Sequence, residues 1–352
     1  MYDFLIVGQG VAGTLMANVL LRKGAKVMVY DNHYFGSSSM AAAGIINPVT
    51  GRKYTLSWQF KELLPTAIEA YRHLEKLLEI SILRYFPVFR SLHSVKEEND
   101  WMLRMQDDKY RDYLGDILTD LPEELKRVIK PPHAGAFIYH AWQVDLPLLL
   151  WNFRKYLQSL DMYRLVFFDH SSLKIKSGYF EYEDLAFKQI IFCEGYQSSR
   201  NPFFRHLPFD PVKGEALVIK VEKNLSCNVR DKLFITSIGS QKYWVGSTNE
   251  WDFVDAKPTL AKKMQLLKEL EDVIACEYDT VDHVAGVRPA TKSRRPFVGE
   301  HPTIKGMFIL GGMGTKGTSL SPFFAKQLAD HIYQKKALSP EVDIQKYNIY
   351  FT

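Results

Sequence analysis

The stretch that decides the fold is YDFLIVGQGVAGTLMANVLLRKGAKVMVYD, at residues 2–31. Its apolar run at 2–7 predicts a buried strand, and the spacing of apolar residues over 14–23 predicts a helix. Gly24 then ends the helix, and the apolar run at 26–30 predicts a second strand. A strand, a helix and a second strand of these lengths predict a βαβ unit.

The turn inside this unit, Gly8-Gln9-Gly10-Val11-Ala12-Gly13, matches GxGxxG. The first glycine permits a tight turn, the second lets the backbone approach a pyrophosphate, and the third lets helix and strand pack closely. Asp31 ends the second strand, where its carboxylate can accept a bond from a ribose hydroxyl and would disfavour the 2′-phosphate of NADP. A glycine turn in a purely structural unit is the other interpretation. Strand, helix and acid in register favour dinucleotide binding, without separating FAD from NAD.

Composition limits the class of protein. The 352 residues are long for one compact domain, so two domains are expected. Hydrophobic residues make up 46% of the chain, which is ample for a buried core. The net charge of +5 is too small to indicate nucleic-acid binding by itself, although it suits an anionic cofactor and substrate.

Several features argue against a metal centre, a disulfide framework or a membrane span. The three cysteines, Cys193, Cys227 and Cys276, form no CxxC pair, which fits reduced thiols in a cytosol. The histidines show no metal-ligand spacing, so no metal is expected. No segment has the roughly 18–20 consecutive apolar residues that a spanning helix needs. We therefore expect a cytoplasmic protein.

The remaining pattern predicts α/β structure at both ends of the chain and a mixed sheet between them. Apolar periodicity predicts a helix over 56–80, divided or kinked at Pro65, and a charged helix over 100–113. A further helix is expected from about 322 to 335. The fold class expected is α/β, with a Rossmann-type FAD-binding domain built on a parallel central sheet and a mixed-sheet α+β substrate domain. The boundaries expected are 1–86, 140–208 and 284–352 for the first domain, and 87–139 and 209–283 for the second.

Four further segments show what the nucleotide domain resembles. They are 38–45 (SSMAAAGI), 189–196 (QIIFCEGY), 285–299 (AGVRPATKSRRPFVG) and 310–322 (LGGMGTKGTSLSP). Together with the βαβ unit they resemble the D-amino-acid-oxidase superfamily of FAD-dependent amine oxidases. Within it the chain is most similar to the glycine oxidases and to the oxidase half of the bacterial enzyme that makes 5-methylaminomethyl-2-thiouridine in tRNA. The third segment is close to the pattern GxRPxTxDxxPxxG, and a NAD enzyme has no reason to carry it.

The resemblance implies bound FAD and a set of residues that contact it. Small residues at 38–45 would lie against the flavin ring, and the loop at 310–322 would close over it. Cys193 and Glu194 depart slightly from the family pattern. The predicted cofactor-binding residues are Gly8, Gly10, Val11, Ala12, Gly13, Asp31, Asn32, Ser38, Ser39, Ala42, Ala43, Gly44, Ile45, Leu173, Cys193, Gly195, Gly312, Met313, Gly314, Thr315, Lys316, Gly317, Thr318 and Ser319. Relatives that bind FAD covalently use a histidine or cysteine, and neither occurs where it is needed, so FAD is expected to be non-covalent.

The resemblance also implies the chemistry, which is oxidation of a C–N bond by hydride transfer to flavin N5. Arg288 is the predicted substrate-binding residue, because its planar guanidinium can bind a carboxylate in bidentate fashion; a structural salt bridge is the other interpretation. Lys316 is a candidate for charge stabilisation beside the flavin or a solvated loop lysine. Arg52 is a weaker substrate-binding candidate, since a surface pair with Lys53 explains it equally well. Glycine oxidases carry a second substrate-binding arginine where this chain has Thr315, which puts glycine itself in doubt.

Three functions stay open at this point. The first is oxidation of a small amine or amino acid, with O₂ or another acceptor taking the electrons. The second is removal of a carboxymethyl group from a tRNA wobble uridine, for which 292–295 (KSRR) would be part of a basic surface. The third is a flavoprotein that senses redox state without catalysis. The sequence does not define the oligomeric state.

Overall fold

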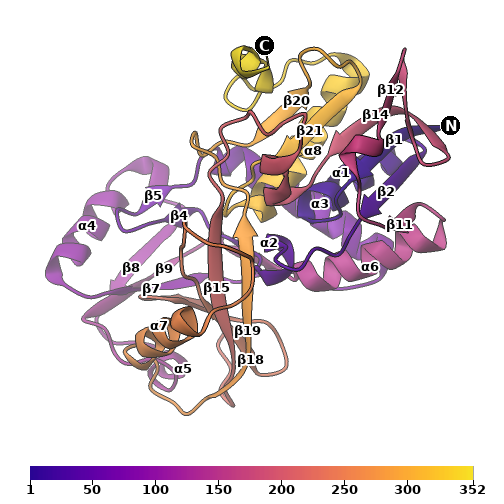
Figure 1. Ribbon diagram of the computed structural model, residues 1–352. Helices are drawn as coiled ribbons and strands as arrows, with labels where there is room; N and C mark the ends of the chain where they lie inside the picture. The colour runs from indigo at the N-terminus through magenta and orange to yellow at the C-terminus, as the bar shows by residue number, and fades with distance from the viewer. Residues whose placement is uncertain (352) are drawn as a thin grey trace.

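The computed structural model describes residues 1–351, and it is built on two eight-stranded sheets (Figure 1). The helices are α1 (Val11–Arg22), α2 (Ser38–Ala41), α3 (Phe60–Leu78), α4 (Val95–Met105), α5 (Glu123–Lys126), α6 (Leu146–Ser159), α7 (Leu260–Glu271) and α8 (Gly317–Gln334). Two small sheets join them: β3 (Ile45–Ile46), β10 (Trp142–Val144) and β6 (Leu83–Tyr85) in one, and β4 (Val49–Thr50) with β5 (Thr55–Leu56) in the other.

The first eight-stranded sheet, here called sheet A, has a parallel centre. Its strands are β1 (Tyr2–Val7), β2 (Val27–Asp31), β11 (Tyr163–Leu165), β12 (Lys174–Lys176), β13 (Tyr179–Tyr182), β14 (Leu185–Phe192), β20 (Phe297–Glu300) and β21 (Met307–Gly311). The order β11-β2-β1-β14-β21 is parallel throughout, while β12, β13 and β20 are antiparallel additions. This confirms the predicted Rossmann-type arrangement.

Strand β1 explains why its sequence is a continuous apolar run. Phe4 and Ile6 pack into a core that includes residues of α1, α3, α6 and α8. Leu5 and Val7 point to the other face, into a second core that includes Phe168 and Phe204. A parallel sheet covered on both faces needs apolar residues at every position, not at alternate ones.

The second eight-stranded sheet, sheet B, is mostly antiparallel. Its order is β19 (Asp279–Arg288), β15 (Val212–Lys220), β18 (Lys242–Gly246), β17 (Phe234–Ser237), β16 (Asn228–Arg230), β7 (Val88–Leu92), β9 (Ala134–Ile138) and β8 (Leu114–Leu118). Helices α5 and α7 cover one face with a hydrophobic core. The long strands β15 and β19 run side by side from this sheet towards the nucleotide-binding part, with α2 beside β19 (Figure 1). The sheet takes its strands from 88–138 and 212–288, which supports our proposed domain division without fixing its boundaries.

Helix α8 starts earlier than the sequence predicted. It begins at Gly317, and Pro322 lies inside it. Proline has no N–H to donate, so the carbonyl four residues earlier, that of Thr318, loses its helical partner. The hydroxyl of Tyr71 on α3 donates to this carbonyl at 2.7 Å and replaces the missing bond. The contact partner lies far away in the sequence, which is why the pattern suggested a start at the proline.

Two other helices also differ from prediction. Pro65 does not divide α3, which runs unbroken through it; the carbonyl that loses its partner there belongs to Lys61, an exposed residue. The helix expected over 100–113 begins at Val95, because Ser94 caps it by accepting a bond from the Glu97 N–H at 3.3 Å.

Candidate active site

A cavity of about 1150 Å³ lies where the two large sheets meet. It is lined by the turn after β1, by α2, by the loop before α8 and by residues of β15, β18 and β19. Such a volume exceeds the usual 300–1,000 Å³ of a small-molecule site, so the cavity is large enough for an extended ligand.

The N-terminus of α1 opens into this cavity. Gly10 is its N-cap, makes no side-chain cap bond, and no acid lies in the first turn. Among residues 1–351, the only side chain bonded to these first amides is Ser39, whose Oγ accepts from the Val11 N–H at 3.1 Å. The remaining N–H groups and the positive end of the helix dipole can therefore bind phosphate oxygens. Gly13 supplies the close packing, since a Cβ there would lie 1.9 Å from the Gly8 carbonyl oxygen.

The N-terminus of α8 opens into the same cavity. Its N-cap, Lys316, makes no side-chain cap bond, and its first turn also contains no acid. Two uncapped helix ends thus place partial positive charge at one cavity, a suitable environment for a ligand with several anionic groups.

Most of the predicted cofactor-binding residues line the cavity. They are Gly8, Gly10, Val11, Ala12, Asp31, Asn32, Ser38, Ser39, Ala42, Ala43, Gly44, Ile45, Cys193, Gly195, Met313, Gly314, Thr315, Lys316, Gly317, Thr318 and Ser319.

Four predicted site residues lie outside the cavity lining. Gly13 is a packing position, and Gly312 is another, since a Cβ there would meet Thr291 at 2.7 Å. The side chain of Leu173 is buried in the aromatic core of sheet A. Arg52 is exposed, whereas its neighbour Gly51 does line the cavity.

The acid at the end of β2 has partners that the sequence did not predict. Asp31 accepts from the Gln9 N–H at 3.0 Å, and its other oxygen lies 3.3 Å from Nη2 of Arg154 on α6. Arg154 also donates to the Gln9 side chain at 2.8 Å. Arg154 therefore holds Asp31 in an ion pair at the end of β2. No local pattern marks Arg154, which is 123 residues from Asp31.

Cys193 lines the cavity but is a poor candidate for covalent attachment. It is buried against the Gly8 turn, and burial raises the pKa of its thiol. The thiolate is the reactive form of cysteine, and this thiol stays protonated. Non-covalent cofactor binding is supported by this environment and stays a proposal.

Arg288 ends β19 at the cavity and has only neutral partners. Its guanidinium donates to Asn249 Oδ1 at 2.8 Å, to Ser247 Oγ at 2.5 Å and to the Thr248 carbonyl at 3.1 Å. No carboxylate lies within 4.0 Å of it among residues 1–351. Burial lowers its pKa, and no neighbouring acid opposes that effect. The salt-bridge interpretation is therefore wrong for this arginine in the described chain.

Sheet B provides the space that the guanidinium occupies. Gly214 on β15 lies opposite Gly286 on β19, beside the pair Val212 and Arg288. A Cβ on Gly214 would lie 2.1 Å from Nη2 of Arg288. Gly286 in turn allows the backbone of α2 to approach, since a Cβ there would be 2.9 Å from Cβ of Ala41.

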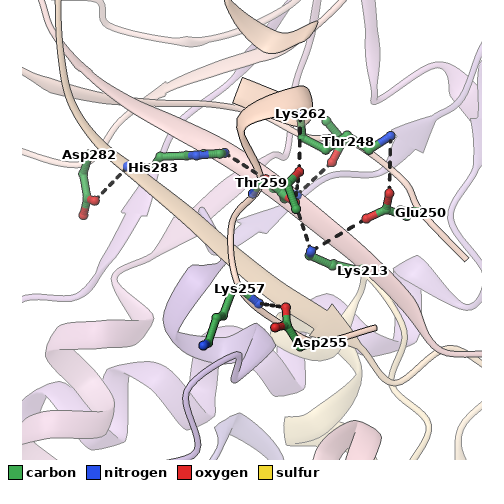
Figure 2. A network of polar contacts seen from close by, with 10 residues as sticks. Lys213, Thr248, Glu250, Asp255, Lys257, Thr259, Lys262, Asp282 and His283 are labelled. Atoms are coloured by element: carbon green, nitrogen blue, oxygen red, sulfur yellow. Dashed lines mark hydrogen bonds and ion pairs between the residues drawn. The ribbon is translucent and has the colours of Figure 1, made fainter. Parts of the chain in front are cut away.

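A buried ion network supports the segment that holds Arg288 (Figure 2). Lys213 is 2% exposed, and its Nζ lies 3.1 Å from Glu215 and 3.7 Å from Glu250. The Glu215 N–H donates to Thr248 Oγ1 at 2.9 Å, and the Glu215 carboxylate accepts from the Thr259 N–H at 2.8 Å. These bonds tie the segment after β18 to β15 and to the start of α7, so the partners of Arg288 are held in place.

Lys316 lies beside α3, with its ammonium against Ser57. Its Nζ donates to Ser57 Oγ at 3.1 Å, and that hydroxyl donates to the Asn47 carbonyl at 2.8 Å. Burial lowers the pKa of Lys316, and the nearby positive charge of Arg295 lowers it further. The solvated-lysine interpretation does not fit this half-buried position.

Aromatic residues of sheet B divide between the two faces. Trp244 and Phe234 line the cavity, and the Trp244 indole N–H donates to the Ala41 carbonyl of α2 at 2.9 Å. Tyr243 points the opposite way into the core under α7, where its hydroxyl donates to the Lys223 carbonyl at 2.6 Å.

Two kinds of feature are absent from the described chain. Residues 1–351 contain no group of three or more His, Cys, Asp or Glu side chains placed to hold a metal ion. Within the same residues, no helix has the length and apolar character needed to cross a membrane.

Comparison with known proteins identifies the family of this chain. The family model described as FAD dependent oxidoreductase (DAO) matches residues 3–331. The chain is 25% identical over 369 residues to a glycine oxidase of Geobacillus kaustophilus (strain HTA426), covering 95% of this chain and 94% of that protein.

Solved structures show the same fold. The glycine oxidase of Geobacillus kaustophilus has a TM-score of 0.82 and 21% identity, covering 98% of this chain and 97% of the other. The iminodiacetate oxidase of Chelativorans sp. BNC1 has a TM-score of 0.79 and 20% identity, covering 98% of both chains.

Proposed function

Because the chain belongs to the DAO family of FAD-dependent oxidoreductases, we propose that it oxidises a small amine that carries a carboxylate. The surroundings of Arg288 support this substrate class. It is a half-buried cation at the cavity with neutral partners only, so a carboxylate from outside would complete its coordination.

The residues at the cavity suit FAD as the cofactor. The α1 N-terminus would take the pyrophosphate, Asp31 would lie near the ribose, and the small residues of α2 would lie against the flavin ring. Bound FAD supplies a two-electron acceptor that takes a hydride from the carbon beside the amine. The α8 N-terminus and Lys316 would stabilise negative charge on the cofactor beside them.

The chain's own task is to place and hold the substrate. Arg288 would bind the carboxylate in bidentate fashion and so fix the carbon beside the amine, while Trp244 closes one side of the cavity. The neutral amine would lose a hydride and become an iminium, which water would hydrolyse to a carbonyl compound and either ammonia or a shorter amine. O₂ or another acceptor then takes the two electrons. The relatives reported above give no support to the wobble-uridine alternative.

The direct test is anaerobic mixing of the purified yellow protein with a panel of amino acids and N-substituted glycines. At least one acid should bleach the flavin absorbance, and the matching amine without a carboxylate should not. If no compound bleaches a flavin that dithionite does reduce, the proposal fails. That result would favour a non-catalytic flavoprotein.

Gly214 offers a test of the Arg288 geometry that leaves the arginine in place. In Gly214→Ala the new methyl must displace the guanidinium, so we expect kcat/KM for the acid substrate to fall at least tenfold, about 1.4 kcal/mol, with normal FAD content. The double variant Gly214→Ala/Arg288→Ala should be no worse than Arg288→Ala alone, because both changes remove the same interaction. Additive losses would show that Gly214 acts elsewhere.

Lys316 offers a test on the cofactor. Lys316→Met removes a cation beside the α8 N-terminus, so we expect the midpoint potential of bound FAD to fall by roughly 10–30 mV, where 30 mV is about 1.4 kcal/mol for two electrons. Dye equilibration measures this potential directly. Lys305→Met, at an exposed lysine, is the control and should leave the potential unchanged. A potential that stays constant or rises in Lys316→Met contradicts the role.

A further inference from the structure

A second cationic group lies on the cavity face of sheet B. Strand register aligns one row across four strands: Ala216 on β15 pairs with Gly246 on β18, Gly246 with Phe234 on β17, and Phe234 with Arg230 on β16. Residues directly opposite on neighbouring strands point to the same face. Ala216, Gly246, Phe234 and Arg230 all line the cavity. The row therefore runs from a floor of small residues to an arginine.

Arg230 resembles Arg288 in having no acidic partner. Its Nη1 donates to the Lys232 carbonyl at 2.7 Å, and its guanidinium carbon lies 5.4 Å from the centre of the Phe234 ring. No carboxylate lies within 4.0 Å in the described part of the chain. Burial lowers the pKa of Arg230 to about 10, and the positive charges of Arg90 and Arg52 also lower it, while the more distant negative charges of Asp231 and Glu269 oppose this effect in part. The group stays protonated at neutral pH in an environment that disfavours its charge.

Arg90 places another guanidinium next to this one. It lies opposite Arg230 on β7 and is 8% exposed. It lies over the ring of Tyr54 at 5.6 Å, and its Nε has no hydrogen-bond partner among residues 1–351. Like charges directly opposite each other on neighbouring strands repel. The acid next in sequence, Asp231, gives no relief at short range, because its carboxylate lies 3.1 Å from His93.

Buried charges in proteins are normally paired. Arg90 is buried and Arg230 is half-buried, and neither guanidinium has a carboxylate partner within 4.0 Å in the described chain. An anionic group from a ligand would supply one. We propose that Arg230, with Arg90 behind it, binds a second anionic group of the substrate, which is therefore an amine carrying two acidic groups. This inference rests on the proposed function, in which Arg288 binds the first carboxylate.

The positions of the two arginines set the spacing of the anions. The Arg288 guanidinium lies against Gly214 of β15, and that of Arg230 lies over Phe234 of β17, with β18 between them. Neighbouring strands are about 4.8 Å apart, and Gly214 lies two residues, or about 7 Å, along β15 from the row, so the two groups are separated by roughly 12 Å. The floor between them, Ala216 and Gly246, has little side-chain volume. A chain of several atoms between two carboxylates, or between a carboxylate and a phosphate, would span this distance.

Binding of diacids that cannot be oxidised is the first measurement. The FAD-loaded protein is titrated with the series malonate to pimelate and with monoacids of equal length, and the change in flavin absorbance gives each Kd. We expect the affinity to peak at an intermediate length and to exceed that of the matched monoacid at least tenfold. In Arg230→Gln the peak should disappear, and in Arg230→Lys part of it should remain. Arg127→Gln, at an exposed arginine outside the cavity lining, should behave as wild type.

Turnover is the second measurement. N-(carboxyalkyl)glycines are compared with N-alkylglycines of equal length, and phosphonate analogues distinguish a carboxylate from a phosphate as the second group. Wild-type kcat/KM should favour the dianionic substrate at least tenfold, and Arg230→Gln should reduce this ratio to about one.

The outcomes separate the two proposals. If N-alkylglycines are oxidised but diacids bind no better than monoacids, the second site is wrong and the proposed function stands. If no amine reduces the flavin but the diacid peak is present and depends on Arg230, the proposed function is wrong and the second anion site stands. FAD content and the thermal midpoint of each variant show whether it has folded.

Discussion

Gly13→Ala should purify largely without FAD. The new methyl would lie 1.9 Å from the Gly8 carbonyl oxygen and 3.3 Å from Cβ of Cys193. Cys193 is buried and the Gly8 carbonyl is backbone at the end of β1, so neither can give way easily and α1 itself must move. Overpacking of this kind costs about 1–3 kcal/mol of stability.

The larger effect is on the cofactor. When α1 shifts, the N–H groups of its first turn no longer point at the pyrophosphate. Losing two charge-assisted bonds of about 1.5–3 kcal/mol each would weaken FAD binding by roughly a hundredfold or more. Titration of apoprotein with FAD, followed by flavin fluorescence, measures this Kd.

Gly24 is the matched control, because it is a glycine at the other end of α1. Its φ is +77°, and no atom lies within 4 Å of the position a Cβ would take. Asparagine tolerates this backbone conformation, so Gly24→Asn should bind FAD as wild type does. A yellow Gly13→Ala protein with normal FAD affinity would show that the pyrophosphate is bound elsewhere.

Arg288→Ala should lower kcat/KM for the true substrate at least a hundredfold. The guanidinium is the cation whose neutral partners, Ser247, Thr248 and Asn249, leave its charge unbalanced at the cavity. Its removal leaves the substrate carboxylate without a partner, which costs about 3–5 kcal/mol. FAD content should be unchanged, because these contacts involve no predicted phosphate-binding residue.

Arg288→Lys separates charge from geometry. Lysine keeps the positive charge but lacks the planar fork, so we expect an activity between those of wild type and Arg288→Ala. Steady-state kinetics on the acid and on the matching amine without a carboxylate completes the experiment. If Arg288→Ala retains near-normal kinetics on the acid, the carboxylate hypothesis is excluded.

Features set by local sequence could be predicted closely. The strand at 2–7, the glycine turn and the strand ending at Asp31 lie where the sequence placed them, because each depends on neighbouring residues. The start of α8 could not be predicted from local sequence, because it depends on the Tyr71 hydroxyl, which donates to the Thr318 carbonyl. Such a contact leaves no periodic signal near the helix.

The site residues show the same difference between local features, which could be predicted, and distant contacts, which could not. Arg288 lies in a recognisable motif, but its neutral coordination comes from a segment about 40 residues away. Arg154 on α6 and the pairing of Arg90 with Arg230 depend on strand and helix order, which a single sequence does not specify. Residues whose function depends on distant partners were therefore missed or left ambiguous.

The order of strands in sheet A has a consequence for biosynthesis. Strand β14 lies between β1, which precedes it in the chain, and β21, which follows it. A nascent polypeptide still attached to the ribosome before Met307 has neither β21 nor α8, which follows it. Contacts between such distant segments form slowly and late. The α8 side of the FAD site can therefore form only once the chain has been synthesised beyond Gly317.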